Sequence, residues 1–281
     1  MTGSVIAFLF TILLLSNGAR RETRFKNATP PVVQSPSATT PLVMHCAAST
    51  RSTMEPICQQ YEQKTGQGIE VQYGGSQSLL SAIVFNGDGD FYLPADETYL
   101  TMAIDRGLVA KLYPVATMRP ILAVRKGNPK SIHTLEDLFR GDVRLVQADP
   151  ELAAIGKITR DAMRVTGAWE SLAGATIAMR STVIDVANDI TIGAADAGFV
   201  FDVVLASHPQ LEAVEIDALR SVVSRVSLSL LKTSRKPSVA QQFADYVVSA
   251  DGGLRVFARH GFQIDGDHAV QVLSAAQDEK E

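Results

Sequence analysis

The sequence predicts an α/β protein with two lobes, each built on a mixed, mostly parallel sheet, and a ligand cleft between them. Strand-like and helix-like segments alternate three times over residues 42–107, and a second alternating set occupies residues 120–204. Such alternation is typical of parallel strands joined by right-handed crossovers. The 281 residues suffice for two modest lobes.

The first lobe is expected over residues 42–118 and 222–265. Its strands are "PLVMHCAA", "IEVQY" and "DFYLPAD", and its helices are "STRSTMEPICQQYEQKTG", "LLSAIVFNG" and "ETYLTMAIDRG". Ser52 and Glu55 predict a capping box in the first helix, and Gly66 predicts its end. "VSRVSLSLLKTS" returns to this lobe, and two helices over residues 237–262 close it.

The second lobe is expected over residues 119–221. "PILAVRKG" crosses into it, followed by a helix at "IHTLEDLFRG", a strand at "DVRLVQADP" and a helix at "KITRDAMRVTG". "ATIAMRS", a helix from Val183 and the strand "AADAGFVFDVV" complete the set. In folds of this kind ligands lie beyond the carboxyl ends of the strands, where helices begin.

The two ends of the chain differ in composition from the body. Val5–Leu15 is an apolar run of signal-peptide length, with cleavage expected after Ala19, although no Lys or Arg precedes it. Residues 1–19 are therefore expected to be a signal peptide or a weak anchor, and residues 20–41 a Pro/Ser/Thr-rich linker. A flexible tail is expected over 266–281. The expected location is periplasmic or extracytoplasmic, with tethering to the membrane as an alternative.

Composition excludes several functions. A net charge of −4 argues against a nucleic-acid binder. Two cysteines, Cys46 and Cys58, are too few for a four-cysteine zinc framework, and either a disulfide or two buried thiols is compatible with them. Residues 86–90 ("NGDGD") lack the spacing and closing Glu of a calcium loop and are interpreted as a turn. No metal or cofactor is expected.

Hydroxyl and glycine residues gather at the predicted strand ends. They are Ser49 with Thr50, Gly74 to Ser76, Ala153 to Gly156, and Ser181 to Val183. At helix N-termini such residues suit an anion, because free N–H groups and the helix dipole face it; ordinary caps and turns are the alternative. Arg180 is a candidate for an additional oxyanion contact. "GGSQS" lacks the last glycine of a serine-hydrolase elbow, and no histidine has an evident orienting partner, so catalysis is not expected.

The order of several motifs resembles the molybdate-binding proteins of ABC transporters, which are type II periplasmic binding proteins. These motifs are "CAAST", "YGGSQSLLSAI", "DFYLPADETYL", "LVQADPELAAIGKITRDAM" and "ADAGFVFDVV". The resemblance covers residues 42–262. It implies a two-lobed clamp that holds molybdate or tungstate by hydroxyls and backbone N–H groups and delivers it to a membrane permease. The ligand-binding residues it implies are Ser49, Ser76, Ile155, Val183 and Phe201, with Thr50, Gly75 and Arg180 as additional candidates.

Three positions depart from that family pattern. Phe201 stands where a phenolic hydroxyl is common, Ile155 replaces a small residue, and Pro94-Ala95-Asp96 replaces "SAD". The loss of one neutral hydrogen bond costs about 0.5–1.5 kcal/mol. The alternatives therefore stay open: another oxyanion, a small organic acid, or a membrane-tethered sensor or interaction module. A monomer is expected.

Overall fold

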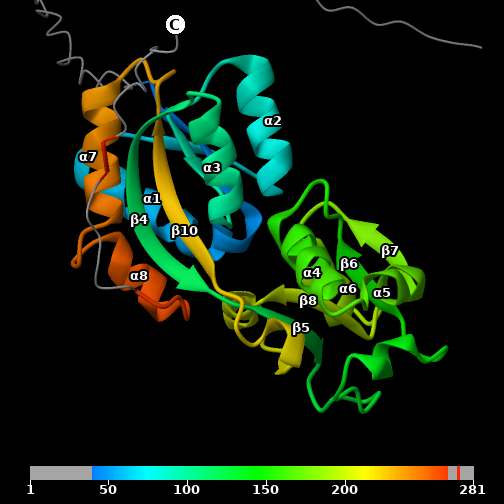
Figure 1. The fold of residues 1–281 in the computed structure, drawn as a ribbon. Helices are drawn as coiled ribbons and strands as arrows, with labels where there is room; N and C mark the ends of the chain where they lie inside the picture. The colour runs from blue at the N-terminus through cyan, green and yellow to red at the C-terminus, as the bar shows by residue number, and fades with distance from the viewer. Residues whose placement is uncertain (1–39, 265–270, 273–281) are drawn as a thin grey trace, which may run out of the picture. The chain divides into compact units, whose positions relative to one another are not determined.

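The computed structural model describes residues 40–264 and 271–272, which form two lobes, each built on one sheet (Figure 1). The predicted signal peptide or anchor, residues 20–39 of the predicted linker and most of the predicted tail lie outside these residues. Within the described ranges, no helix combines the length and the hydropathy needed to cross a membrane. The predicted α/β class with two mixed sheets is confirmed.

The first sheet has six strands in the order β11-β4-β10-β3-β1-β2. Strand β1 pairs in parallel with β2 and β3, whereas β10 pairs antiparallel with β3 and β4. Helices α1, α7 and α8 cover one face, and α2 and α3 cover the other (Figure 1). The bounds are β1 Leu42–Ala47, α1 Arg51–Thr65, β2 Ile69–Gly74, α2 Ser76–Asn86, β3 Phe91–Leu93, α3 Glu97–Asp105, β4 Val109–Met118, β10 Ser224–Leu231, α7 Pro237–Val247, α8 Gly253–Arg259 and β11 Gln271–Val272.

The second sheet has five strands in the order β7-β6-β8-β5-β9. Strand β6 pairs in parallel with β7 and β8, and β5 pairs antiparallel with β8 and β9. Helices α4 and α6 both pack on β6 and β8. The bounds are β5 Pro120–Arg125, β6 Leu145–Ala148, α4 Ala154–Val165, α5 Trp169–Ala175, β7 Thr176–Arg180, α6 Val183–Thr191, β8 Ala197–Phe201 and β9 Leu211–Val214.

In the part of the chain that the structure describes, parallel pairing occurs only among three strands in each lobe. Strands β1, β2 and β3 in one lobe and β6, β7 and β8 in the other all pair in parallel, while β4, β10, β5 and β9 pair antiparallel. The expectation of mostly parallel sheets is thus correct only for these strands. Because parallel strands end at the same edge, each lobe brings its loops together at one place.

The chain crosses between the lobes at Arg119, the single residue between β4 and β5, and returns before β10 begins at Ser224. Asp202, directly after β8, fixes the first crossing. Its Oδ1 accepts hydrogen bonds from the backbone N–H groups of Arg119 (3.0 Å) and Val203 (2.8 Å), and its own N–H donates to the Arg119 carbonyl (2.9 Å). Asp202 therefore fixes the backbone at the hinge between the lobes.

Two local predictions are wrong. Helix α1 begins at Arg51 without a side-chain cap, so Ser52 and Glu55 form no capping box; a 3-10 turn at Ala48–Thr50 leads directly into the helix. The segment "IHTLEDLFRG" forms only a 3-10 turn, Glu136–Phe139, because the Asp137 carboxylate accepts the N–H groups of His133 and Thr134 and holds them in a loop. The prediction that Gly66 ends α1 is confirmed, with φ 76°.

Candidate functional site: a small pocket between the lobes

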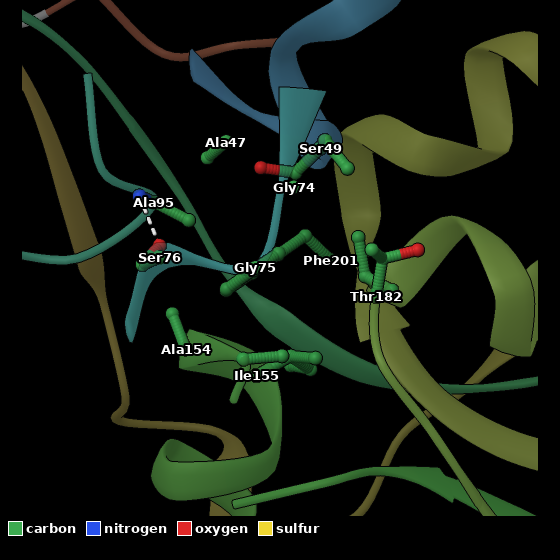
Figure 2. Close-up of a pocket in the computed structure, with 13 residues that line it drawn as sticks. Ala47, Ser49, Gly74, Gly75, Ser76, Ala95, Ala154, Ile155, Thr182 and Phe201 are labelled. Atoms are coloured by element: carbon green, nitrogen blue, oxygen red, sulfur yellow. Dashed lines mark hydrogen bonds between the residues drawn. The ribbon is translucent and has the colours of Figure 1, made fainter. Parts of the chain in front are cut away.

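A small pocket lies where the two lobes meet (Figure 2). Its volume is about 10 Å³, close to the least space that holds one water molecule. The first lobe lines it with residues at or just beyond the ends of β1, β2 and β3, and the second lobe with residues at or beyond the ends of β6, β7 and β8. The lining residues are Ala47, Ala48, Ser49, Gly74, Gly75, Ser76, Ala95, Ala153, Ala154, Ile155, Thr182, Val183 and Phe201.

Helix N-termini from both lobes converge on this pocket. The 3-10 turn ahead of α1 and the start of α2 approach from the first lobe, and α4 and α6 from the second. The backbone N–H groups of Ile155 and Val183 lie in the first turns of α4 and α6, and no acceptor among the described residues bonds them. Such amides, together with the positive ends of the helix dipoles, favour a negatively charged ligand.

Ser49 supplies a hydroxyl that has no partner in the described protein. Its side chain is 4% exposed, and its Oγ makes no hydrogen bond. A buried hydroxyl without a partner costs free energy, so it marks a place where a ligand is expected. In Figure 2 this hydroxyl points to the same side of the pocket as that of Ser76.

The Ser76 hydroxyl is fixed by its neighbours so that its proton remains available. Its Oγ accepts a hydrogen bond from the Ala95 N–H (3.0 Å), and Tyr92 donates its phenolic O–H to the Ser76 carbonyl (2.8 Å). Ser224, the first residue of β10, in turn donates to the Ala95 carbonyl (2.6 Å). The Ser76 hydroxyl is thereby held as an acceptor on one side and a donor toward the pocket.

Thr182 lines the pocket but uses its hydroxyl elsewhere. Its Oγ1 donates to the Asp185 carboxylate (2.7 Å) and accepts from the Asp185 N–H (3.2 Å), which forms a capping box at the start of α6. In Figure 2 the hydroxyl points away from the pocket. Thr182 therefore orients the first turn of α6, which carries Val183, and does not offer a side-chain donor.

Two of the candidate residues lie outside the pocket lining. The Thr50 hydroxyl donates to the Ala47 carbonyl (2.9 Å) and contacts the Cys46 sulfur (3.0 Å). Arg180 pairs through Nε with the Asp189 carboxylate of α6 (2.6 Å). The structure brings together Ser49, Gly75, Ser76, Ile155, Val183 and Phe201, and leaves Thr50 and Arg180 in structural contacts.

The pocket is electrically neutral apart from its dipoles. No lining residue has a charged or titratable side chain, and Ile155 and Phe201 add apolar walls, each 1% exposed. Among the described residues no group of three His, Cys, Asp or Glu side chains is placed to hold a metal ion. The nearby cysteines, Cys46 and Cys58, are free buried thiols, and burial raises the pKa of the Cys46 thiol well above its ordinary value. The arrangement suits binding through neutral donors.

Sequence reasoning missed two supporting residues, Tyr92 and Ser224. Tyr92 bonds the Ser76 carbonyl and Ser224 bonds the Ala95 carbonyl, whereas Thr182 belongs to the segment Ser181 to Val183 that the sequence does single out. The contact between Ser224 and Ala95 joins residues 129 positions apart, and no local pattern reports such a contact.

Comparison with known proteins finds a matching family and several relatives. A model of the bacterial extracellular solute-binding protein family matches residues 42–263. A putative binding protein of Haemophilus influenzae is 27% identical over 225 residues, which span 79% of this chain and 90% of the relative. The molybdate-binding protein ModA of Mycobacterium tuberculosis is also 27% identical over 225 residues, spanning 79% of this chain and 84% of the relative. These relatives are named as binding proteins.

Solved structures share the fold at low identity. The periplasmic molybdate-binding protein of Azotobacter vinelandii superposes with a TM-score of 0.66 at 15% identity, covering 80% of this chain and 99% of that one. A periplasmic thiamin-binding protein superposes with a TM-score of 0.71 at 16% identity, covering 83% and 86%. The family match spans the whole described body except its two ends, and the chain belongs to the bacterial extracellular solute-binding proteins.

Proposed function

We propose that this protein captures a small tetrahedral oxyanion, molybdate or tungstate, outside the cytoplasm and delivers it to an ABC importer. The unpartnered Ser49 hydroxyl carries the proposal, because it faces a pocket surrounded by helix N-termini from both lobes. Ser49 and Ser76 donate from the first lobe, and the N–H groups of Ile155 and Val183 donate from the second. An oxyanion held by both sets stabilises the closed arrangement of the lobes.

The size and polarity of the pocket support an inorganic ion. The pocket is small, with a volume of about 10 Å³ that is close to the least that holds one water-sized group, and its donors are neutral. Neutral donors stabilise an anion locally even in a protein with a net charge of −4, because distant charges are screened. The named molybdate-binding relative at 27% identity supports the same ligand class.

A second candidate keeps the fold and changes the ligand. Phe201 lies in the pocket wall without a hydroxyl, and Ile155 adds bulk beside it. Both replace polar or small groups in the pattern that the sequence resembles, and an apolar wall of this kind also suits a small organic acid with one anionic end. The partner in either case is a membrane permease, and the binding protein acts as a monomer.

Thermal unfolding with different anions tests the proposal. A ligand that binds only the folded protein at 100 times its dissociation constant stabilises it by about 2.7 kcal/mol, roughly 5–10 °C in Tm for a protein of this size. We expect molybdate and tungstate to give such shifts at micromolar concentrations, and sulfate and phosphate to give much smaller ones. A shift with acetate or lactate alone would favour the second candidate.

Calorimetric titration of Ser49→Ala and Ser76→Ala then tests the assignment of the site. Each variant should bind molybdate more weakly, while Ser78→Ala, an exposed serine of α2, serves as the matched control. If no oxyanion raises the Tm at millimolar concentration, the proposed function fails. If both pocket variants bind as tightly as the control, the ligand lies elsewhere.

A further inference from the structure

The two lobes touch each other directly beside the pocket, at the start of α2. The N–H of Gln77 donates to the Leu152 carbonyl in the second lobe (3.1 Å). Gly75, two residues earlier, lies against the carbonyls of Leu152 and Ser181. Leu152 precedes α4 and Ser181 precedes α6, so one loop of the first lobe contacts both helix starts of the second.

The backbone of Gly75 does not itself require glycine. Its φ of −71° and ψ of 144° are ordinary extended values that an alanine adopts without strain. A Cβ at this position would instead lie well under 3.0 Å from the Leu152 carbonyl oxygen and 2.8 Å from that of Ser181. Both obstacles are backbone atoms, so no side-chain rotation relieves the overlap. Both also belong to the other lobe.

We infer that Gly75 sets how closely the two lobes approach, and that any side chain at residue 75 holds them apart. This inference rests on the proposed function only for the identity of the ligand. When the lobes close, the amides of Ile155 and Val183 come within reach of an ion bound to Ser49 and Ser76. Gly75 is thus a positioning residue that acts through the opposite lobe. Its substitution leaves each lobe able to fold and removes their full closure.

Cross-linking tests closure without any ligand. The variants Gln77→Cys and Leu152→Cys together place thiols on the two residues joined by the hydrogen bond between the lobes, and the native Cys46 and Cys58 are buried. Under mild oxidation this protein should form the disulfide rapidly. Adding Gly75→Ala should slow its formation at least tenfold. Adding Gly141→Ala, whose Cβ enters open space in the second lobe, should leave the rate unchanged.

Molybdate titration adds a second measurement on the protein without engineered cysteines. Gly75→Ala should unfold at the same temperature as wild type without ligand, within about two degrees, and bind molybdate at least tenfold more weakly. Equal cross-linking rates with and without Gly75→Ala, or no cross-link at all, would overturn the inference whatever the ligand. If Gly75→Ala slows the cross-link as expected but wild type binds no oxyanion, the inference stands and the proposed function alone is overturned.

Discussion

Ser49 and Ser76 are both buried serines of one pocket, yet their hydroxyls have different surroundings. The Ser49 hydroxyl has no partner, whereas that of Ser76 accepts the Ala95 N–H. Ser49→Ala should therefore leave the Tm of the ligand-free protein unchanged or slightly raised. Ser76→Ala should lower the unfolding free energy by about 1–3 kcal/mol, because it leaves a buried N–H unpaired. Urea unfolding of the ligand-free variants measures this difference.

Both substitutions should weaken oxyanion binding by similar amounts. Hydrogen bonds to a charged group contribute about 1.5–3 kcal/mol, which is roughly 10- to 150-fold in affinity. A Ser49 variant that is as destabilised as the Ser76 variant would show that Ser49 has a structural partner in solution and would weaken its assignment to the ligand.

Side-chain direction explains which residues the sequence could identify. Ser49 and Thr50 are neighbours with the same chemistry, but a 3-10 turn directs one hydroxyl to the pocket and the other back to the Ala47 carbonyl. Arg180 lies next to the pocket loop in sequence, but an acidic partner on α6 binds its guanidinium. The motifs located the loops correctly, whereas the direction of each side chain depends on contacts made by other elements.

His45 gives a pH-dependent stability that is separate from ligand binding. The ring is 2% exposed, with Nε2 4.0 Å from the Asp88 carboxylate, and burial lowers its pKa from 6.5 more than Asp88 raises it. Protonation therefore favours the unfolded chain, and the contribution of His45 to stability is present above about pH 6.5 and declines below it. His45→Gln should show a flatter loss of unfolding free energy between pH 7.5 and 5.5. Parallel pH profiles for the two proteins would contradict this.

At the scale of elements, the first turn of α4 depends on a glycine that packs against β6. A Cβ on Gly156 would overlap the Ala148 carbonyl and lie 2.8 Å from that of Asp149, so alanine must push the helix start outward. Overpacking of this kind typically costs 1–3 kcal/mol. Gly156→Ala should lower the Tm and also weaken oxyanion binding, since Ile155 belongs to the same turn. Calorimetry with and without molybdate measures both effects.

Gly174 in α5 provides the opposite case. Its Cβ would meet nothing within 4 Å, and alanine is favoured over glycine in a helix by about 0.5–1 kcal/mol. Gly174→Ala should therefore raise the free energy of unfolding by up to about that amount and leave binding unchanged. A loss of stability on urea unfolding would show that α5 is not helical at this residue.

Elements with a strong periodic pattern were predictable, and those shaped by distant partners were not. Strand β4 was not predicted because it contains Pro114, a residue that is uncommon within strands. At this proline the pairing of β4 with β10 shifts by one residue. The start of α1 was misplaced because a 3-10 turn, in which the Thr50 hydroxyl donates to the Ala47 carbonyl, leads into the helix without a side-chain cap. Glycines such as Gly66 marked helix ends correctly, since a positive φ is a local requirement.

At the scale of the whole described body, the sequence identified two lobes because strands visibly leave one set and return to it. It could not show how the lobes meet. Two contacts join residues from separate motifs. In one, Gly75 lies against Leu152 and Ser181; in the other, Asp202 accepts a hydrogen bond from Arg119. Such contacts follow from the mutual placement of the two sheets, which no periodicity along the chain encodes.

The hydrogen bonds of Asp202 at the crossing between the lobes allow a last prediction, which concerns both lobes. The Asp202 carboxylate accepts the N–H groups of Arg119 and Val203; burial raises the pKa of this carboxyl, and those two N–H groups oppose the rise. Asp202→Ala leaves both amides without this acceptor, so the unfolding free energy should fall by about 1–3 kcal/mol. Because the crossing strand then holds the lobes less firmly, molybdate should also dissociate faster. Asp202→Asn keeps one acceptor oxygen, so its unfolding free energy, measured with urea, and its molybdate dissociation rate, measured by stopped flow, should lie between those of wild type and Asp202→Ala. If Asp202→Ala releases molybdate at the wild-type rate, Asp202 contributes only to local stability.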